Sequence, residues 1–233
     1  ERDKLGVLTL SSGAIDWIAE EPQLYPHAVL AGTGQDFLCI HHLESHTRAA
    51  LVRGHDLRPL PNLSGRRSLL PHAALPDGGW LAEAYDADAP HELVAVAADG
   101  SCRVIWRAPP EPARKHTAPQ DFRWTAPDGR AMQGWLYRPL EVPKGLIGYV
   151  HGGPTWHSED WVNPKIQFWV SQGYAVLDPN YRGSTGFGHA HREAVKEDGW
   201  GGREQADIRA GLEAALSTRL PGPVPVAGNS YCG

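Results

Sequence analysis

The most informative part of the sequence is the stretch Val224-Pro225-Val226-Ala227-Gly228-Asn229-Ser230-Tyr231-Cys232-Gly233. In this stretch a short apolar run is followed by a serine on a turn that contains glycine. Residues 224–227 suit a strand buried within a sheet. A serine on a sharp strand-to-helix turn exposes its hydroxyl at the edge of the sheet, where a nucleophile belongs. We therefore expect Ser230 to be a nucleophile, with a plain loop serine as the alternative. The pattern G-x-S-x-G is not met strictly, since Cys232 takes the place of the second glycine and Gly233 follows it.

Two further apolar runs, residues 146–150 and 174–177, also end in Gly-rich or polar turns. Helical patterns lie between the three runs, at residues 164–171 and 204–217, and the second repeats apolar side chains at helical spacing. Strands that alternate with helices predict a mostly parallel sheet with a site at its carboxyl edge. A hairpin with strands at 122–125 and 132–137 is expected to lead into this sheet.

The motif His151-Gly152-Gly153-Pro154 directly follows the first of these apolar runs. Acyl transfer needs backbone N–H donors near the developing oxyanion, and adjacent glycines let the main chain approach a substrate carbonyl closely. We interpret the motif as an oxyanion segment rather than only as a tight turn, because a serine turn follows downstream.

Two other Gly-rich segments are interpreted as structural. Asn180-Tyr181-Arg182-Gly183-Ser184-Thr185-Gly186 lacks the spacing of a nucleotide-binding loop. We expect Arg182 to pair with a carboxylate and to order the floor of the site, with Asp207 as one candidate partner. Gly199-Trp200-Gly201-Gly202 precedes the second helix, where Glu204 and Asp207 in the first turns suit the helix dipole.

Residues 1–115 follow a different pattern, in which short β-type segments alternate with turn residues and no helical stripe occurs. The clearest hairpin spans residues 93–106 around a two-residue turn at Asp99-Gly100. An all-β sandwich, barrel or propeller portion is expected. A Pro-rich stretch at 108–119 is interpreted as a linker, which places a domain boundary near residue 115 and gives domains 1–115 and 116–233. The expected strands are residues 7–10, 14–18, 37–41, 49–52, 80–85, 93–97 and 102–106.

Composition excludes several classes of protein. The 233 residues carry a net charge of −5 without a basic block, so we expect no nucleic-acid partner, and no apolar run approaches the ~18 residues of a membrane span. Three widely spaced cysteines argue against a disulfide framework and favour a reducing, cytoplasmic compartment, with an export signal upstream of Glu1 left open. His41, His42 and His46 lack cysteine or regular acidic partners, so no metal or cofactor is expected.

Taken together and in this order, the four Gly-rich segments of the second half resemble the prolyl oligopeptidase family of serine peptidases. The resemblance is strong over residues 120–233 and only architectural before that. It implies a β-propeller portion at 1–115, followed by the first part of an α/β-hydrolase domain with a mostly parallel sheet at 116–233. The implied substrates are short peptides, cleaved by a peptidase of the aminopeptidase, dipeptidyl or acylaminoacyl type. Ser230 would be the nucleophile, Tyr231, Gly152 and Gly153 would form the oxyanion hole, and His151 and Arg182 would support the site.

Three departures from the family pattern are visible. Cys232 stands where the family has glycine, the Asp and His of a triad do not follow Ser230, and residues 1–115 are too few for seven or eight blades. The resemblance therefore implies part of a larger peptidase that is inactive by itself. A carboxylesterase of the same hydrolase fold and a non-catalytic peptide-binding protein stay open as alternatives, and the β-rich first half favours the peptidase.

Overall fold

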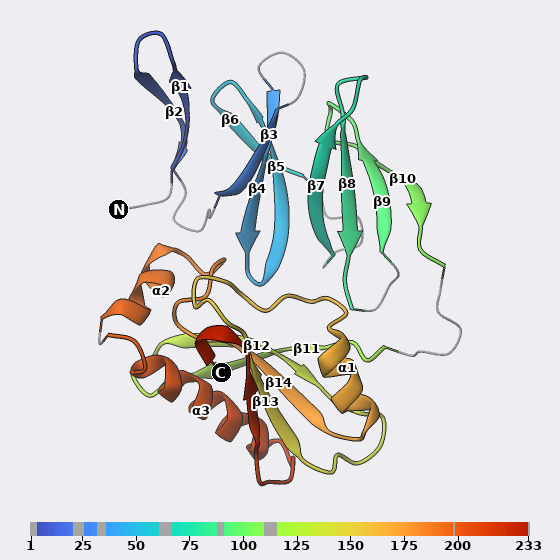
Figure 1. The fold of residues 1–233 in the computed structure, drawn as a ribbon, viewed down its shortest axis with the longest axis vertical. Helices are drawn as coiled ribbons and strands as arrows, with labels where there is room; N and C mark the ends of the chain where they lie inside the picture. Colours follow the sequence, from blue (N-terminus) through green and yellow to red (C-terminus); the bar gives the residue numbers. More distant parts are fainter. Residues whose placement is uncertain are drawn as a thin grey trace. The chain divides into compact units, whose positions relative to one another are not determined.

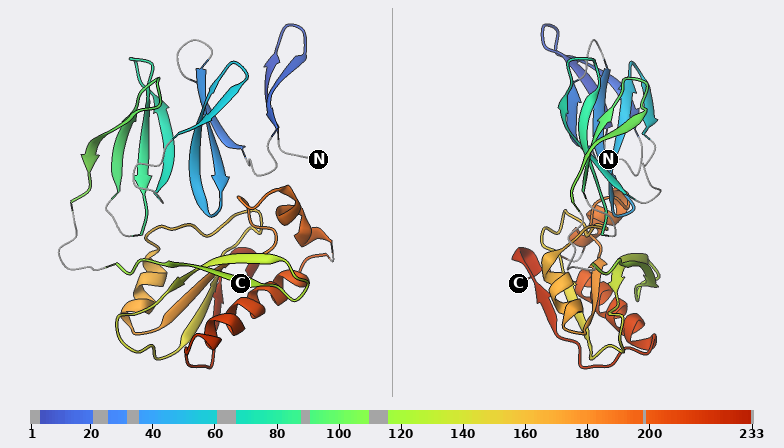
Figure 2. Two further views of the ribbon diagram at one scale, coloured as in Figure 1. Left: turned by 180° about the vertical axis from the view of Figure 1, so that it is seen from behind. Right: turned by 90° about the vertical axis from the view of Figure 1, so that its right-hand side faces the viewer.

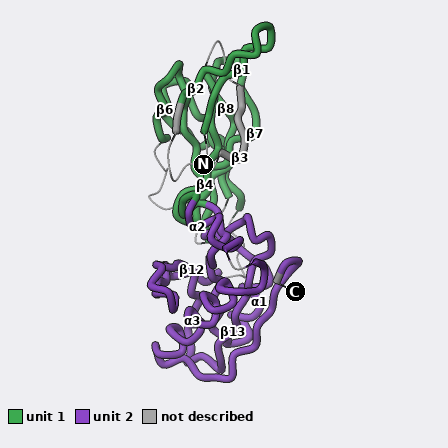
Figure 3. Tube along the Cα trace, turned by 90° about the vertical axis from the view of Figure 1, so that its left-hand side faces the viewer, with its two compact units in different colours: residues 1–112, 186–189 green, residues 113–185, 190–233 purple. Residues whose placement is uncertain are grey.

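The computed structural model describes residues 4–20, 26–31, 36–60, 67–87, 91–109, 116–197 and 199–232. The chain divides into two compact units, coloured separately in Figure 3. Unit 1 comprises Glu1–Pro112 and Gly186–His189, and unit 2 comprises Ala113–Thr185 and Ala190–Gly233. The domain boundary predicted near residue 115 lies outside the described residues.

Unit 1 consists of antiparallel sheets (Figure 1). Among residues 1–112, the described part contains no helix, which confirms the prediction of an antiparallel β structure for these residues. A two-stranded hairpin is formed by β1 (Lys4–Thr9) and β2 (Ala14–Glu20). The first four-stranded sheet contains β3 (Pro26–Ala31), β4 (Asp36–Leu43), β5 (His46–Arg53) and β6 (Asp56–Pro59). The second contains β7 (Ser68–Ala74), β8 (Trp80–Tyr85), β9 (Glu92–Val96) and β10 (Cys102–Arg107).

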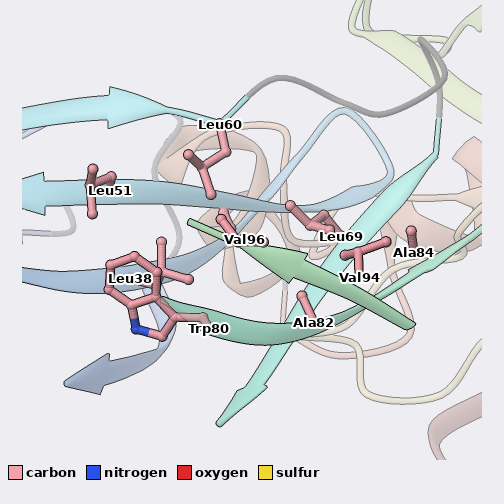
Figure 4. Packing of buried hydrophobic residues seen from close by; sticks show 10 residues of the cluster. Leu38, Leu51, Leu60, Leu69, Trp80, Ala82, Ala84, Val94 and Val96 are labelled. Carbon is pink, nitrogen blue, oxygen red and sulfur yellow. The ribbon is translucent and has the colours of Figure 1, made fainter. Parts of the chain in front are cut away.

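One apolar core joins the two four-stranded sheets of unit 1. Leu38 and Leu51 from the first sheet belong to the same buried cluster as Trp80, Val94 and Val96 from the second (Figure 4). The alternating burial along β8 and β9 produces this cluster, because every second side chain of a strand points to the same face. The two sheets therefore stack face to face through a shared core.

The hairpin predicted around Asp99-Gly100 is present, but its turn is longer than expected. The Ala97 N–H donates to the Ser101 carbonyl at 2.8 Å, which leaves three residues in the loop rather than two. Gly100 occupies the left-handed region with φ of +87°. This is the three-residue hairpin loop that closes on a glycine, a connection nearly as common as the two-residue turn.

Unit 2 is built on a five-stranded sheet, and the prediction of a mostly parallel sheet is wrong. The strand order is β11-β12-β14-β13-β15, with two antiparallel and two parallel pairings. The reason is that the hairpin predicted as a lead-in joins the sheet itself, because its second strand pairs antiparallel with β14. The strands are β11 (Gln120–Thr125), β12 (Ala131–Tyr137), β13 (Leu146–Val150), β14 (Ala175–Asn180) and β15 (Val226–Gly228).

The two predicted helices cover opposite faces of this sheet (Figure 2). Helix α1 (Pro164–Ser171) packs Ile166 and Val170 against one face, and Asn163 caps its start by accepting the backbone N–H groups of residues 165 and 166. Helix α3 (Arg203–Ser217) packs Leu212 and Ala215 against the other face. A short helix α2 (His189–Glu193) was not predicted. Over the described residues, no helix has both the length and the apolar character needed to cross a bilayer.

Candidate active site

The order of the strands brings two turns of unit 2 together. Strand β13 lies between β14 and β15, so the chain moves to one side of β13 through α1 and to the other side through α3. Such a reversal of strand order opens a crevice at the carboxyl ends of the strands. The register pairs Val150 at the end of β13 with Gly228 at the end of β15. The segments that follow, which begin with His151 and Asn229, therefore start side by side.

Gly152 lies directly against the serine turn. A Cβ added to Gly152 would stand 2.8 Å from the Asn229 carbonyl oxygen and 3.0 Å from the Ser230 Cβ. Gly153 has φ of +129°, a backbone conformation that residues with a Cβ rarely adopt. A Cβ added to Gly153 would lie 2.8 Å from the backbone N of Thr155. Only glycine fits at these two positions without a shift of the backbone, and at Gly152 the space is closed by the serine turn itself.

Ser230 adopts a strained backbone conformation. Its φ is +56°, in the left-handed region, and it begins the short 3-10 turn η2 (Ser230–Cys232). This region costs a residue with a Cβ about 1–2 kcal/mol relative to its normal conformation. The residue is exposed, and no described side chain forms a hydrogen bond with its hydroxyl. Strain of this kind persists only where the surroundings impose it, and it concentrates at functional sites.

His151 is a buried, neutral side chain with both ring nitrogens engaged. Its Nε2 lies 3.0 Å from the Ser184 hydroxyl, its Nδ1 lies 2.8 Å from the Gly152 carbonyl oxygen, and its ring stacks on Tyr181 at 4.6 Å between centroids. Burial lowers the pKa of His151 from 6.5 to about 4, although the bond to the Gly152 carbonyl opposes this shift. Because the ring is locked in place, His151 supports the turn after β13 and is not positioned as a general base.

Arg182 forms a buried ion pair with Asp207 on α3. The guanidinium donates to both carboxylate oxygens, at 2.7 Å from Nε and 2.6 Å from Nη2, and the Arg182 backbone N–H adds a third bond at 3.1 Å. Asp128 joins the pair at 2.9 Å from a more exposed position. Side-chain hydrogen bonding to Asp207 raises the pKa of Arg182 further above its usual value. The pair ties the segment after β14 to α3, which matches the partner suggested by the sequence.

A buried polar network holds the segment after β13 on the sheet. The Ser158 backbone N–H donates to Asn180 Oδ1 at 2.7 Å, and the Trp135 indole N–H donates to the Ser158 carbonyl at 3.0 Å. Asn180 Nδ2 donates to the same carbonyl at 3.1 Å and to Gln133 Oε1 at 2.8 Å. The Ser158 hydroxyl donates to Asp178, and burial raises the pKa of Asp178 to about 7. The segment that begins with the HGGP motif is therefore fixed by side chains of two strands, β12 and β14.

The sequence reasoning missed one contact of the serine turn. The Tyr231 hydroxyl donates to Glu204 Oε1 on α3 at 2.6 Å, and the Trp200 ring meets the Tyr231 ring edge-on at 5.5 Å. The sequence favours the interpretation of Glu204 as an acidic residue that suits the helix dipole. No sequence signal links these residues, because 27 positions separate Glu204 from Tyr231.

Comparisons with known proteins relate part of this chain to one family. Residues 160–233 match the model of the prolyl oligopeptidase family. The uncharacterised peptidase YuxL of Bacillus subtilis is 29% identical over 163 residues, which cover 66% of this chain and 25% of that protein. Dipeptidyl peptidase family member 6 of Caenorhabditis elegans is 36% identical over 109 residues, which cover 46% of this chain and 15% of that protein.

A solved structure shares the fold of nearly the whole chain. The acylaminoacyl peptidase of Pyrococcus horikoshii superposes with a TM-score of 0.83 over 99% of this chain and 37% of its own, at 22% identity. The chain spans a quarter or less of the length of the two curated relatives.

Proposed function

The resemblance to the prolyl oligopeptidase family is confirmed by the match over residues 160–233, and on that premise we propose that Ser230 is the nucleophile of a serine peptidase. The proposed substrates are short peptides, cleaved in the dipeptidyl or acylaminoacyl manner of the relatives' names. The main observation behind the proposal is that the exposed Ser230, with its positive φ, lies directly against Gly152 at the point where the strand order reverses.

In the proposed mechanism, the Ser230 hydroxyl oxygen attacks the carbonyl carbon of the scissile bond and forms an acyl-enzyme. The negative charge that develops on the carbonyl oxygen would be stabilised by the backbone N–H of Tyr231 and by those of Gly152 and Gly153. The leaving amine takes up the proton that the serine loses, through a general base that acts next as an acid. His151 and Arg182 hold the turns that present these groups.

The proposed general base is not among the residues that the structure describes near Ser230. His151 is occupied by Ser184 and Gly152, and its low pKa makes it a weak proton acceptor. In α/β-hydrolases the acid and the histidine follow the nucleophile along the chain. We therefore propose that they come from residues C-terminal to Ser230 in the whole protein, and that the 233 residues alone show no Ser230-dependent turnover.

We further propose that the sheets of unit 1 are blades of a β-propeller. Two four-stranded antiparallel sheets stacked through one core fit neighbouring blades. The outermost strands of this unit expose apolar side chains that a further blade would cover: Val7, Leu8, Ile15 and Trp17 on the hairpin, and Val104, Ile105 and Trp106 on β10. A structure of the whole protein without further four-stranded sheets against these strands would contradict this assignment.

The test of the peptidase uses the complete reading frame that encodes these residues. Wild type and Ser230→Ala are assayed on chromogenic aminoacyl, dipeptidyl and N-acylaminoacyl anilides and on short-chain esters. We expect the wild type to hydrolyse the anilides. In Ser230→Ala, kcat should fall by a factor of roughly 10⁴–10⁶. Ser217→Ala, at the exposed end of α3, is the matched control and should retain activity.

Three results would change the proposal. Ester hydrolysis without anilide hydrolysis would assign the protein to the carboxylesterases. Turnover that survives in Ser230→Ala would show that Ser230 is not the nucleophile. Ser230-dependent turnover by the 233 residues alone would refute the proposal that the general base lies C-terminal to Ser230.

A further inference from the structure

The residue directly after the proposed nucleophile is anchored through its side chain to α3. We propose that Glu204 is a positioning residue for the serine turn, and that it acts through the Tyr231 hydroxyl. The inference rests on the proposed role of Ser230. It assigns a task to a residue that neither the sequence motifs nor the proposed mechanism uses.

Glu204 is itself rigidly held. Its side chain lies in the first turn of α3 and is 3% exposed. One carboxylate oxygen accepts the Gly202 backbone N–H at 2.9 Å, and the other accepts the Gly201 backbone N–H as well as the Tyr231 hydroxyl. Burial works to raise the pKa of Glu204, but the hydrogen bonds outweigh it and hold the pKa below its ordinary value. The carboxylate is therefore a fixed, charged acceptor.

The Tyr231 side chain has both apolar and polar contacts. One part of the ring contacts the apolar cluster that contains Trp124, Val150 and Tyr181, and Trp200 meets it edge-on. The hydroxyl bond to Glu204 adds a directional contact that favours one orientation of the ring.

The orientation of Tyr231 matters because of the strain next to it. Ser230 has a positive φ, which a serine keeps only where neighbouring contacts impose it. The Tyr231 backbone N–H is also a proposed donor to the oxyanion. Anchoring the Tyr231 side chain therefore fixes both the serine hydroxyl and the N–H beside it.

A purely structural role for Glu204 makes a different prediction. If Glu204 only stabilised the start of α3, as the helix-dipole interpretation holds, its removal would lower thermal stability and leave the kcat of the folded protein unchanged. If Glu204 positions the serine turn, kcat falls while KM changes little, because the interaction supports the reacting groups rather than substrate binding.

The experiment compares four variants of the complete reading frame: Glu204→Ala, Glu204→Gln, Tyr231→Phe and the double variant Glu204→Ala/Tyr231→Phe. We expect kcat to fall about 10- to 100-fold in Glu204→Ala and in Tyr231→Phe, with KM within about threefold of wild type. The double variant should be no worse than the worse single variant, because both remove the same contact. Glu204→Gln keeps one acceptor oxygen and should recover part of kcat. Glu213→Gln, on the exposed side of α3, is the control.

The inference is overturned if kcat is unchanged in Tyr231→Phe, or if the two single effects multiply in the double variant. Tyr231→Phe decides the matter even where Glu204→Ala fails to fold. Absence of any Ser230-dependent turnover in wild type would refute the proposed function alone. Crystal structures of wild type and Glu204→Ala then decide the inference, which expects the Tyr231 ring to turn and φ of Ser230 to leave the positive region. An unchanged serine turn in the variant would refute it.

Discussion

The strain at Ser230 predicts that replacing this serine by glycine stabilises the protein. Ser230 has φ of +56°, is exposed, and has no side-chain hydrogen bond among the described residues. Removal of its hydroxymethyl group therefore loses no hydrogen bond that the structure records, while it relieves the steric penalty of the left-handed region.

The expected gain is the difference between two opposing free energies. Relief of the left-handed conformation contributes about 1–2 kcal/mol. Glycine makes the unfolded chain more flexible, which costs about 0.5–1 kcal/mol. At the midpoints of these two ranges, the free energy of unfolding should thus rise by about 0.8 kcal/mol in Ser230→Gly. In Ser230→Ala it should change by less than that, because alanine keeps the Cβ that causes the strain.

Urea unfolding of the 233 residues, followed by tryptophan fluorescence, measures this difference. With a typical m-value of about 2 kcal/mol per molar urea, the midpoint of Ser230→Gly should shift upward by about 0.3–0.5 M. Arg219→Gly is the matched positive control, because Arg219 is an exposed residue of the same unit with φ of +68°. If Ser230→Gly proved no more stable than Ser230→Ala while Arg219→Gly was stabilised, the strain argument for Ser230 would be wrong.

Three other predictions follow from contacts of the site. In the complete reading frame, Gly152→Ala should lower kcat by about 10²–10³, because its Cβ would collide with the serine turn, whereas Gly145→Ala, whose Cβ meets only the edge of a tyrosine ring at 3.4 Å, should keep activity. In urea unfolding, Asp207→Ala should lower the free energy of unfolding by about 3–5 kcal/mol, because it leaves the buried Arg182 guanidinium without its main partner. Asp128→Ala should lower it by about 1 kcal/mol or less. The pKa of His151 is lowered to about 4 in the folded state, so the unfolded state binds more protons between pH 6.5 and 4. The free energy of unfolding should therefore fall by up to about 3 kcal/mol as pH falls through this window. The dependence of this free energy on pH should be weaker in His151→Gln. A slope that is unchanged in that variant would show that another group controls it.

The elements that the sequence predicted correctly are those whose local pattern and tertiary setting agree. Both long helices of unit 2 begin and end within a residue of the predicted positions, because the apolar spacing that predicted residues 204–217 also forms the face that α3 buries against the sheet. The close approach of the segments that begin with His151 and Asn229 could also be expected, because parallel neighbours bring their carboxyl ends to one edge.

Three strands were missed, and all three share one cause. Strands β3, β6 and β7 each contain a proline, at Pro26, Pro59 and Pro71, and proline argues against a strand because it cannot donate to the ladder. Each of these strands lies at the edge of its sheet, where an unpaired side tolerates proline. In β3 and β7 the register also shifts beside the proline. Edge position depends on the tertiary fold, so a single sequence could not reveal it.

Contacts between residues far apart in the sequence are the part of the site that the sequence did not predict. The sequence indicated Ser230 and Gly152 through their motifs, but it gave no signal for Glu204, whose partner lies 27 positions away. It offered Asp207 as one candidate partner of Arg182, but it interpreted Glu204 as a residue that suits the helix dipole. In the structure they have two separate long-range partners, which only the packing of α3 on the sheet brings within reach.

The start of α3 therefore connects the two turns on which the proposed chemistry depends. Glu204 and Asp207 are three residues apart, so they lie on the same side of the helix. Asp207 holds Arg182 after β14, and Glu204 holds Tyr231 after β15. Arg182 is in turn two residues before Ser184, whose hydroxyl contacts His151 at the start of the Gly152 turn. All three segments at the carboxyl edge are thus fixed relative to one helix end, and a shift of α3 would move the serine turn and its floor together.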